Sequence, residues 1–310
     1  PLQYQNAEHV KSEETDGKLA LTTEENSTVT YEFESPEDGL YHLILEYYPL
    51  LGKNTKIERK LYIDGKILFD ELGRIELNRI YKDQEPAIEK DTNGNEYFNG
   101  LIEAAQWISY AIEDSYGYYK DPFQFYLAKG KHTLTIESVK EPVAIGGITF
   151  KNLPSARPYA EVLNEWKKNG ATDATENLPI LEAEKSDRKS DSILTPTYDR
   201  NSSKTTPISC ETIKMNIISS DKWQQAGQWL EWEIDVKQSG LYKMAFRVRQ
   251  NTNDGMLCTR KLLIDGNVPF AEAENITVGY DTKWQIVTLG KDQEPYYIYL
   301  EKGRHTLRLQ

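Results

Sequence analysis

The sequence predicts an all-β protein built from two similar modules in tandem. Three observations lead to this prediction: short segments that alternate apolar with polar residues, Asp-Gly and Lys-Gly turns between them, and recurrence of the pattern in the second half of the chain. Alternation with a period of two is typical of a strand with one buried face. The length of 310 residues also suits two domains, because one domain takes roughly 100–200 residues.

An internal repeat defines the two modules. Arg59–Gly65 recurs as Arg260–Gly266, an offset of 201 residues (260 − 59), whereas Tyr126–Leu134 recurs as Tyr299–Leu307, an offset of 173 (299 − 126). The first module therefore carries 28 extra residues (201 − 173) between these anchors.

The position of the extra residues depends on how the middle of each module is aligned. Lys82–Pro86 is identical to Lys291–Pro295, but Trp107–Ile112 matches Trp284–Leu289 in pattern and is followed in the same way by an acidic turn, a Pro and an aromatic strand. We prefer the second alignment. It predicts a long polar loop at about 80–105 of the first module.

Both modules carry alternating segments that end at Gly, Pro, Asn or Asp, which indicates strands. The predicted strands are Val29–Glu34, Tyr41–Tyr48, Leu230–Val236 and Tyr242–Gln250. Ile-Asp-Gly at 63–65 and 264–266 predicts a tight hairpin turn, because Asp-Gly adopts the positive φ angles that such turns need. Short strands at this spacing favour a sandwich or barrel over alternating βα units.

The closing strand is present in one module only. The first module continues to Val143–Phe150, whereas the second reaches only Gln310, the counterpart of Glu137. We therefore expect the second module to lack its last strand. This difference and the start at Pro1, without a Met, indicate a piece of a longer polypeptide.

A short helix is predicted between the modules. Tyr159, Val162, Leu163 and Trp166 fall at helical spacing within 159–168, and Gly170 follows as a stop signal. The predicted domains are thus 1–152, a helix and linker at 153–178, and 179–310. Residues 186–207 are polar and without clear period, which predicts a long loop that covers the second module or is partly disordered.

Charge and composition exclude several functions. The chain has 49 acidic and 37 basic residues, and no run of Lys and Arg, so nucleic acid is not an expected partner. The apolar runs are short and broken by charge, so this segment is not expected to insert into a membrane. Two cysteines, Cys210 and Cys258, do not make a disulfide framework and are compatible with a bridge or with free thiols.

We expect no enzyme activity. The sequence contains no Gly-x-Ser-x-Gly, no His-Glu-x-x-His and no phosphate-binding Gly-rich loop. Its many acids make numerous carboxylate pairs, and only their separation in space would identify a glycosidase. The 20 Tyr and 6 Trp residues point instead to surfaces that bind sugars or proteins.

The pattern resembles carbohydrate-binding modules of families 6 and 35. The matching segments are Glu-Ala-Glu at 182–184, the Trp-rich strand at 229–234, Gly-Leu-Tyr at 240–242, Leu-Leu-Ile-Asp-Gly at 262–266, and 300–309. The tandem with its linker helix is also similar to the N-terminal region of large Firmicutes extracellular solute-binding proteins of sugar transporters. The resemblance implies two jelly rolls of the galactose-binding-like type, a polysaccharide or oligosaccharide ligand, an extracellular or cell-surface location in a Gram-positive bacterium, and a further C-terminal domain.

The resemblance also implies a structural calcium, held in part by the Glu-x-Glu start of a module. Glu182 and Glu184 match this feature in the second module. The first module has only Ala7-Glu8 at that place, and its closing strand reads Ile145-Gly146-Gly147-Ile148, without the Asp that completes the family site.

Aromatic residues in loops are the main candidates for sugar contacts, because a ring face stacks on the apolar face of a pyranose. In the second module these are Trp223, Trp229 and Tyr280; Trp229 begins a strand and is equally a candidate for the core. Arg247 and Arg249 share one strand face, as donors to hydroxyl or carboxylate groups or as an ordinary solvated face.

The first module offers Tyr116, Tyr118 and Tyr119 in a polar context. They suit a sugar-binding surface or, alternatively, a cap on the edge of the sandwich. The favoured function is non-catalytic glycan binding by a secreted or cell-surface protein. The alternative is a structural or protein-interaction spacer whose modules have lost sugar binding.

Overall fold

The computed structural model describes residues 3–201, 204–291 and 294–310. The chain forms two compact units: unit 1 comprises Pro1–Ile80 and Glu103–Pro154, and unit 2 comprises Tyr81–Ile102 and Ser155–Gln310. The prediction of antiparallel β-sandwich architecture is confirmed. The long loop predicted at about 80–105 is an excursion whose residues Tyr81–Ile102 belong to unit 2.

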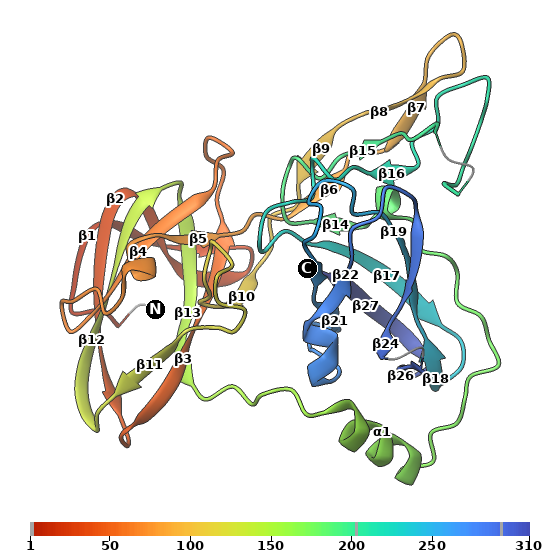
Figure 1. Cartoon of the computed structure of the whole chain (residues 1–310). Helices are drawn as coiled ribbons and strands as arrows, with labels where there is room; N and C mark the ends of the chain where they lie inside the picture. Colours follow the sequence, from red (N-terminus) through yellow and green to blue (C-terminus); the bar gives the residue numbers. More distant parts are fainter. Residues whose placement is uncertain (1–2, 202–203, 292–293) are drawn as a thin grey trace. The chain divides into compact units, whose positions relative to one another are not determined.

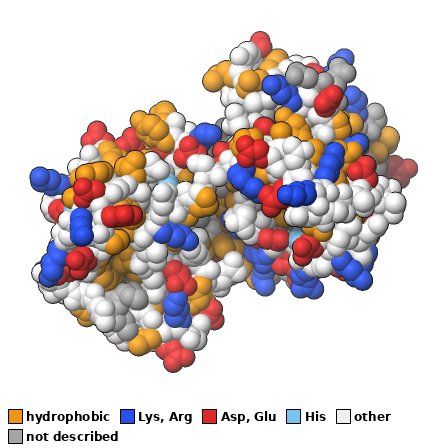
Figure 2. All heavy atoms as spheres, turned by 90° about the horizontal axis from the view of Figure 1, so that it is seen from below, with side chains coloured by type: hydrophobic (Ala, Val, Ile, Leu, Met, Phe, Trp, Pro, Cys, Tyr) orange, Lys and Arg blue, Asp and Glu red, His pale blue; other side chains and the backbone are white. Residues whose placement is uncertain are grey.

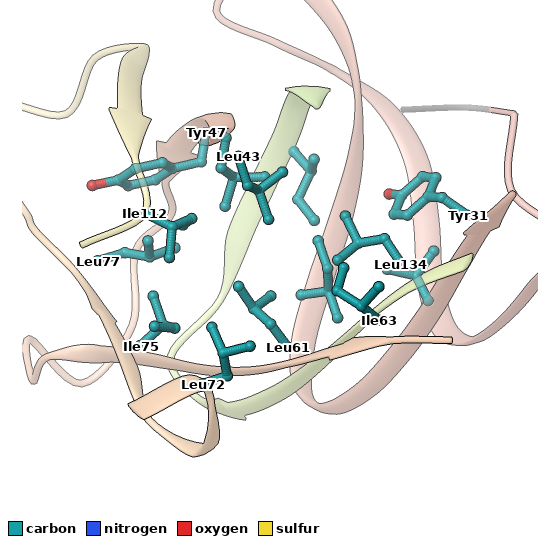
Figure 3. Close-up of a cluster of buried hydrophobic side chains, with 14 of the residues drawn as sticks. Tyr31, Leu43, Tyr47, Leu61, Ile63, Leu72, Ile75, Leu77, Ile112 and Leu134 are labelled. Atoms are coloured by element: carbon teal, nitrogen blue, oxygen red, sulfur yellow. The ribbon is translucent and has the colours of Figure 1, made fainter. Parts of the chain in front are cut away.

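Nine strands of unit 1 wrap around one core (Figure 1). They are β1 (Asn6–Thr15), β2 (Lys18–Ser35), β3 (Gly39–Pro49), β4 (Ile57–Ile63), β5 (Ile75–Leu77), β10 (Ile108–Ala111), β11 (Gln124–Leu127), β12 (Gly130–Lys140) and β13 (Val143–Lys151). The order is β10-β3-β13-β2-β12-β4-β5, with β1 on β2 and β11 on β3. Figure 3 shows the inward faces meeting, with Leu43, Leu61 and Leu134 among the buried side chains.

Unit 2 has one larger sheet and several two-stranded pairs. Its elements are β6 (Tyr81–Asp83), β7 (Ile88–Lys90), β8 (Glu96–Phe98), β9 (Leu101–Glu103), α1 (Tyr159–Lys168), β14 (Arg188–Lys189), β15 (Pro196–Thr197), β16 (Ile217–Ile218), β17 (Leu230–Val236), β18 (Gly240–Lys243), β19 (Ala245–Val248), β20 (Cys258–Arg260), β21 (Leu262–Ile264), β22 (Ile276–Val278), β23 (Gln285–Thr288), β24 (Gly290–Lys291), β25 (Glu294–Pro295), β26 (Tyr297–Leu300) and β27 (Gly303–Leu309). The larger sheet has the order β21-β27-β17-β14-β6-β9.

The strand registers confirm the alignment of the repeat. Leu134 faces Tyr31 across β12 and β2, and the residues at the predicted offsets, Leu307 and Trp232, face each other across β27 and β17. Ile108 faces Tyr47 in unit 1, just as Gln285 faces Val248 in unit 2. The offset at Trp107 and Trp284 is 177 (284 − 107), so 24 of the 28 extra residues (201 − 177) precede Trp107 and four (177 − 173) lie between Trp107 and Tyr126.

The excursion completes the larger sheet of unit 2. Tyr81 of β6 pairs with Lys189 of β14, and the fully buried Lys189 ammonium forms an ion pair with Asp83. Further out, Glu96 accepts hydrogen bonds from the Lys214 side chain at 2.8 Å and the Met215 backbone at 3.1 Å. A segment that belongs to the first module in the sequence thus adds strands to the larger sheet of unit 2.

Helix α1 begins and ends where the sequence predicts and packs on the core of unit 2. Val162 is buried, and the Tyr159 ring lies 4.9 Å from that of Phe270. Gly170 adopts a φ of 87°, and its N–H bonds to the carbonyl of Lys167, which ends the helix. The following segment pairs with β18, since the Leu241 N–H bonds to the Thr172 carbonyl at 2.9 Å.

No helix among the described residues is both long and apolar enough to span a membrane. On the face drawn in Figure 2, Lys and Arg side chains are interspersed with Asp and Glu. Cys210 and Cys258 are free thiols.

The two Asp-Gly turns carry the same histidine contacts. Asp64 and Asp265 have φ angles of 49° and 50°, as a tight hairpin turn requires. His132 Nδ1 lies 2.8 Å from the Asp64 carboxylate and its Nε2 lies 2.7 Å from a carbonyl, and His305 repeats both contacts with Asp265 and Glu301. Each ring thus has an acceptor at both nitrogens, which fits the doubly protonated form.

The histidine contacts predict a pH dependence of stability. The Asp64 carboxylate raises the pKa of His132; burial opposes the charge on His305, but hydrogen bonds to Asp265 and to a carbonyl outweigh it, so its pKa is raised too. Stability from a raised histidine pKa is present below the unfolded value and is lost as pH rises through the folded value. We expect the free energy of unfolding, measured by urea titration, to fall as the pH rises above about 6.5, the unfolded histidine value.

The double variant His132→Asn and His305→Asn should show a flatter pH profile over this range. His9→Asn is the matched control, because His9 is exposed and already has a left-handed φ of 55° that Asn tolerates. An equally steep profile in the double variant would contradict the assignment.

Candidate functional site

A tyrosine-rich loop of unit 1, residues 114–121, joins β10 to β11 and is called here the tyrosine loop. The carboxylate of Asp114, which is 6% exposed, accepts hydrogen bonds from the backbone N–H groups of Tyr116, Tyr118 and Tyr119 at 2.9, 2.6 and 3.1 Å. Gly117 supplies a φ of 73° at the turn. One buried carboxylate thus holds the backbone of all three tyrosines in place.

The three tyrosine side chains reach solvent. Tyr116, Tyr118 and Tyr119 are 52%, 84% and 61% exposed. The rings of Tyr116 and Tyr118 lie 6.3 Å apart with 34° between their planes, and the Tyr119 ring meets Phe123 edge-on at 6.5 Å. These exposures do not fit a cap that covers the edge of the sandwich, so the tyrosine loop presents aromatic surface.

Charged groups border the tyrosine loop. Arg74 donates to the Tyr116 hydroxyl at 3.1 Å, and its guanidinium lies 5.7 Å from the centre of that ring. The same guanidinium pairs with Glu76 at 2.9 Å, while the Ser115 hydroxyl accepts the Glu76 backbone N–H. Ring faces beside charged hydrogen-bonding groups are the combination by which proteins hold sugar rings and their hydroxyls.

Unit 2 contains a hollow of about 590 Å³. It is lined by Lys204, Thr206, Arg247, Trp284, Gln285 and Ile286. The Arg247 guanidinium donates to the Lys204 carbonyl at 2.8 Å. Such a volume is in the range of small-ligand sites, and one indole among polar groups suits a small polar ligand with an apolar face.

Asp199 organises one side of this hollow. Its carboxylate accepts hydrogen bonds from the Trp284 indole N–H at 3.0 Å and from Arg249 at 2.9 Å, and the Arg249 guanidinium lies 4.9 Å from the Trp284 ring centre. Burial acts to raise the pKa of Asp199, but these hydrogen bonds hold it below its usual value. Arg249 is therefore engaged within the protein, whereas Arg247 is exposed.

The other aromatic candidates of unit 2 do not join this hollow. Trp229 is only 5% exposed and lies under the Arg308 guanidinium at 3.9 Å, so it is a core residue. Trp223 is half-buried, with Arg260 at 4.4 Å from its ring and its indole N–H bonded to the Gln228 carbonyl. Tyr280 is 38% exposed, and its neighbour Asp281 is tied to Gln250 just beyond β19.

The carboxylates implied for calcium lie in unit 2 beside a 3-10 turn, Ala183–Lys185. Glu184 is buried and its Oε1 has no hydrogen-bond partner, a property that a cation ligand has; burial raises its pKa to about 7. Glu182 accepts from the Thr206 hydroxyl at 3.2 Å. No group of three or more metal-ligating side chains occurs among the described residues. Calcium takes 6–8 oxygens and these two carboxylates supply at most four of them, so Glu182 and Glu184 alone do not make a calcium site.

Sequence reasoning missed the residues that hold these surfaces in place. Asp114, Arg74 and Asp199 were not singled out, and Trp284 served only to align the modules. The Asp-Ser-Tyr-Gly motif at 114–117 was a usable signal, because Asp accepts backbone N–H groups in turns and Gly permits positive φ.

No protein-family model matches the chain, and no curated protein matches it. Distant structural similarity to carbohydrate-binding modules covers about half of the chain. A family 35 module from Clostridium thermocellum aligns with 11% identity over 48% of this chain and 92% of that chain, at a TM-score of 0.27. A family 6 module from Cellvibrio mixtus lichenase 5A, in complex with cellotriose, aligns with 11% identity over 49% and 93%, at 0.26.

A cycloisomaltooligosaccharide glucanotransferase of Paenibacillus aligns with 98% of this chain and 44% of its own, at 11% identity and a TM-score of 0.27. Because TM-scores this low do not establish a shared ligand, function is inferred from this chain's own residues.

Replacing the buried acceptor should loosen the tyrosine loop. In Asp114→Ala the backbone N–H groups of Tyr116, Tyr118 and Tyr119 lose their partner, and each such hydrogen bond contributes about 0.5–1.5 kcal/mol. We expect hydrogen exchange at these amides to accelerate by roughly tenfold or more, read by NMR or mass spectrometry. Asp121→Ala, in the same loop but exposed, is the matched control. Unchanged exchange in Asp114→Ala would refute the role of this carboxylate.

Proposed function

We propose that the chain binds glycans without altering them and that the tyrosine loop of unit 1 is a contact surface for them. The observation that carries this proposal is the exposure of Tyr116, Tyr118 and Tyr119 on a backbone fixed by one buried carboxylate. Clustered exposed apolar surface marks interaction sites, and a rigid loop loses little entropy when a ligand binds.

The chemistry of the tyrosine loop suits sugar rings. The C–H face of a pyranose stacks on an aromatic ring, while the half-exposed Arg74 guanidinium offers a donor to hydroxyl groups. Each aromatic contact contributes only about 0.5–1.5 kcal/mol beyond area burial. Several contacts along a polymer are therefore needed, which favours a polysaccharide over a single sugar.

The hollow of unit 2 is a second candidate contact within the same proposal. Its Trp284 edge, Gln285 amide and Arg247 guanidinium combine an indole with hydrogen-bonding groups. Arg247 occupies the position of Glu46 in unit 1. This change of charge supports a different glycan preference in each unit.

The proposal extends to location. A protein that captures polysaccharides for uptake encounters them outside the cell. The tandem with its linker helix also resembles the N-terminal region of solute-binding proteins of sugar transporters. We therefore propose a secreted or cell-surface protein of a Gram-positive bacterium that captures glycan for uptake, with a further C-terminal domain in the same polypeptide. This part depends on the sequence resemblance alone.

Removing two exposed rings should weaken glycan binding. In affinity electrophoresis against a panel of plant and bacterial polysaccharides, we expect at least one polymer to retard the chain. The double variant Tyr118→Ala and Tyr119→Ala should bind that polymer roughly 5- to 100-fold more weakly, because two aromatic contacts are lost.

Tyr126→Ala is the matched control, since Tyr126 is 62% exposed on β11 of the same unit but outside the tyrosine loop. Its retardation should equal that of the parent. Loss of retardation only in Arg247→Ala would move the site to the hollow of unit 2. If none of the polymers retards the parent chain, glycan binding is refuted and the spacer alternative is favoured.

A further inference from the structure

Two tryptophans at equivalent places of the repeat are neither core residues nor part of the tyrosine loop. Trp107 directly precedes β10 of unit 1, and Trp284 directly precedes β23 of unit 2. Both are half-buried, whereas Trp229 and Trp232 of unit 2 are only 5% and 6% exposed. Each of the two half-buried rings therefore keeps some accessible aromatic surface.

The Trp107 ring packs against the backbone of β13. A Cβ on Gly146 would lie 2.5 Å from this ring, so the absence of a side chain makes room for it. Gly147 likewise makes room for the Glu46 carboxylate, which would lie 2.8 Å from a Cβ built there. The Tyr48 ring meets the Trp107 ring edge-on, with 5.5 Å between the centres and 63° between the planes. The indole is thus held from two sides.

An ion pair borders this indole. Lys18 of β2 pairs with Glu46 of β3, and their side chains are 38% and 36% exposed. The Lys18 ammonium lies 5.1 Å from the centre of the Trp107 ring, whereas the Arg308 guanidinium lies 3.9 Å from that of the buried Trp229. The cation beside Trp107 therefore covers its ring less closely.

Unit 2 repeats this arrangement with charged residues from other positions. The Arg249 guanidinium lies 4.9 Å from the centre of the Trp284 ring and pairs with Asp199 at 2.9 Å. Arg249 is the counterpart of Tyr48 (249 − 201), not of Lys18. A half-buried indole beside a cation and a carboxylate thus occurs in both units, although the charged residues are not equivalent. This recurrence favours a common ligand chemistry over inheritance of one structural contact.

The side chains around Trp107 suit a neutral sugar. The C–H face of a pyranose packs on an indole, while the Lys18 ammonium donates to hydroxyl groups and the Glu46 carboxylate accepts from them. The exposed Ser109, opposite Glu46 across β10 and β3, adds a further hydroxyl. Because the two charges compensate each other, the surroundings of the ring favour an uncharged ligand over an acidic one.

Strand β10 separates this ring from the tyrosine loop. Trp107 precedes its first residue, Ile108, and the tyrosine loop begins at Asp114, three positions (114 − 111) after its last residue, Ala111. Four strand residues span about 13 Å, which is longer than one sugar ring. A single sugar therefore reaches one of the two places, whereas an oligosaccharide is long enough for both.

We propose that Trp107, with Lys18 and Glu46, is a second glycan contact of unit 1, and that it binds together with the tyrosine loop to one neutral sugar chain that follows β10. This inference rests on the proposed glycan binding and names the kind of ligand, an internal stretch of an uncharged polysaccharide. Two weak contacts that share one chain give a higher affinity than either contact alone.

Isothermal titration calorimetry of the whole 310-residue chain tests this proposal. The probes are xylohexaose, mannohexaose, laminarihexaose and isomaltohexaose, each with the triose of the same series. We expect at least one hexaose to bind at least about tenfold more tightly than its triose, because only the longer chain reaches both contacts. Equal affinities of hexaose and triose in every series that binds would overturn the proposal.

Removal of the ion pair examines the contact at Trp107. The double variant Lys18→Ala and Glu46→Ala should bind the hexaose at least about fivefold more weakly, since hydrogen bonds to hydroxyl groups are lost and no unpaired charge is left behind. Glu32→Ala with Lys131→Ala is the matched control, because this pair is exposed on β2 and β12 of the same unit at 2.8 Å. The control should bind within about twofold of the parent.

A second measurement does not depend on how variants fold. In the whole chain labelled with ¹⁵N at its six tryptophans, the indole signal of Trp107 should shift saturably as the hexaose is added. The signal of the buried Trp232 should not move. An unmoved Trp107 signal at saturating hexaose, or equal affinity of the parent and the Lys18 and Glu46 double variant, would refute the second contact.

Failure of this inference is distinguishable from failure of the proposed function. If a hexaose binds and the variant Tyr118→Ala and Tyr119→Ala weakens it, while the Trp107 signal stays in place, the tyrosine loop binds glycan alone and only this inference falls. If none of these oligosaccharides and none of the polysaccharides binds the parent chain, glycan binding itself is refuted.

Discussion

A strand buried in a protein must have its backbone N–H and C=O groups paired, and this constraint organises both units. In unit 1, β13 lies between β2 and β3, and the residues of β3 beneath it are nearly inaccessible. Unit 2 keeps the same registers across β17, β27 and β21. Segments distant in the sequence pair with two of its strands: β6 of the excursion pairs with β14, and Asp173 after α1 pairs with Leu241 of β18.

The repeat was predictable because strand pairing preserves sequence spacing. Residues that face each other across two strands must keep their alternation together, so the offsets of 201 and 173 read from the sequence reappear as cross-strand pairs such as Leu307 with Trp232. The helix at 159–168 was equally predictable, since its apolar spacing and terminal Gly are local signals. In contrast, β14 and β6 are two and three residues long, too short for any periodicity. Tertiary contacts, such as the ion pair of Lys189 with Asp83 and the hydrogen bonds from Lys214 and Met215 to Glu96, show where the excursion belongs.

The residue types of the candidate surfaces were predictable from the sequence, but the contacts and the burial of these residues were not. Clustered tyrosines in a polar context pointed to the tyrosine loop. The role of Asp114 is visible only in the structure, where its carboxylate accepts three backbone N–H groups. Trp223, Trp229 and Trp284 look alike in sequence. An Arg lies over each ring, but Trp229 is buried whereas Trp223 and Trp284 are half-buried, and contacts distant in the chain set this difference.

Duplication of one fold allows the two units to recognise different ligands. Where Glu46 of unit 1 pairs with Lys18, unit 2 has Arg247 bonded to a loop carbonyl, so the charge on equivalent strand faces is reversed. After β10 unit 1 has the tyrosine loop, whereas in the described part of unit 2 Gly290 and Lys291, just after β23, pair with Pro295 and Glu294. Loops can change in this way without loss of the core, because the strand pairs that bury the core do not include them. Unit 1 thus presents the tyrosine loop and unit 2 presents the hollow beside Trp284, on different residues of the same duplicated fold.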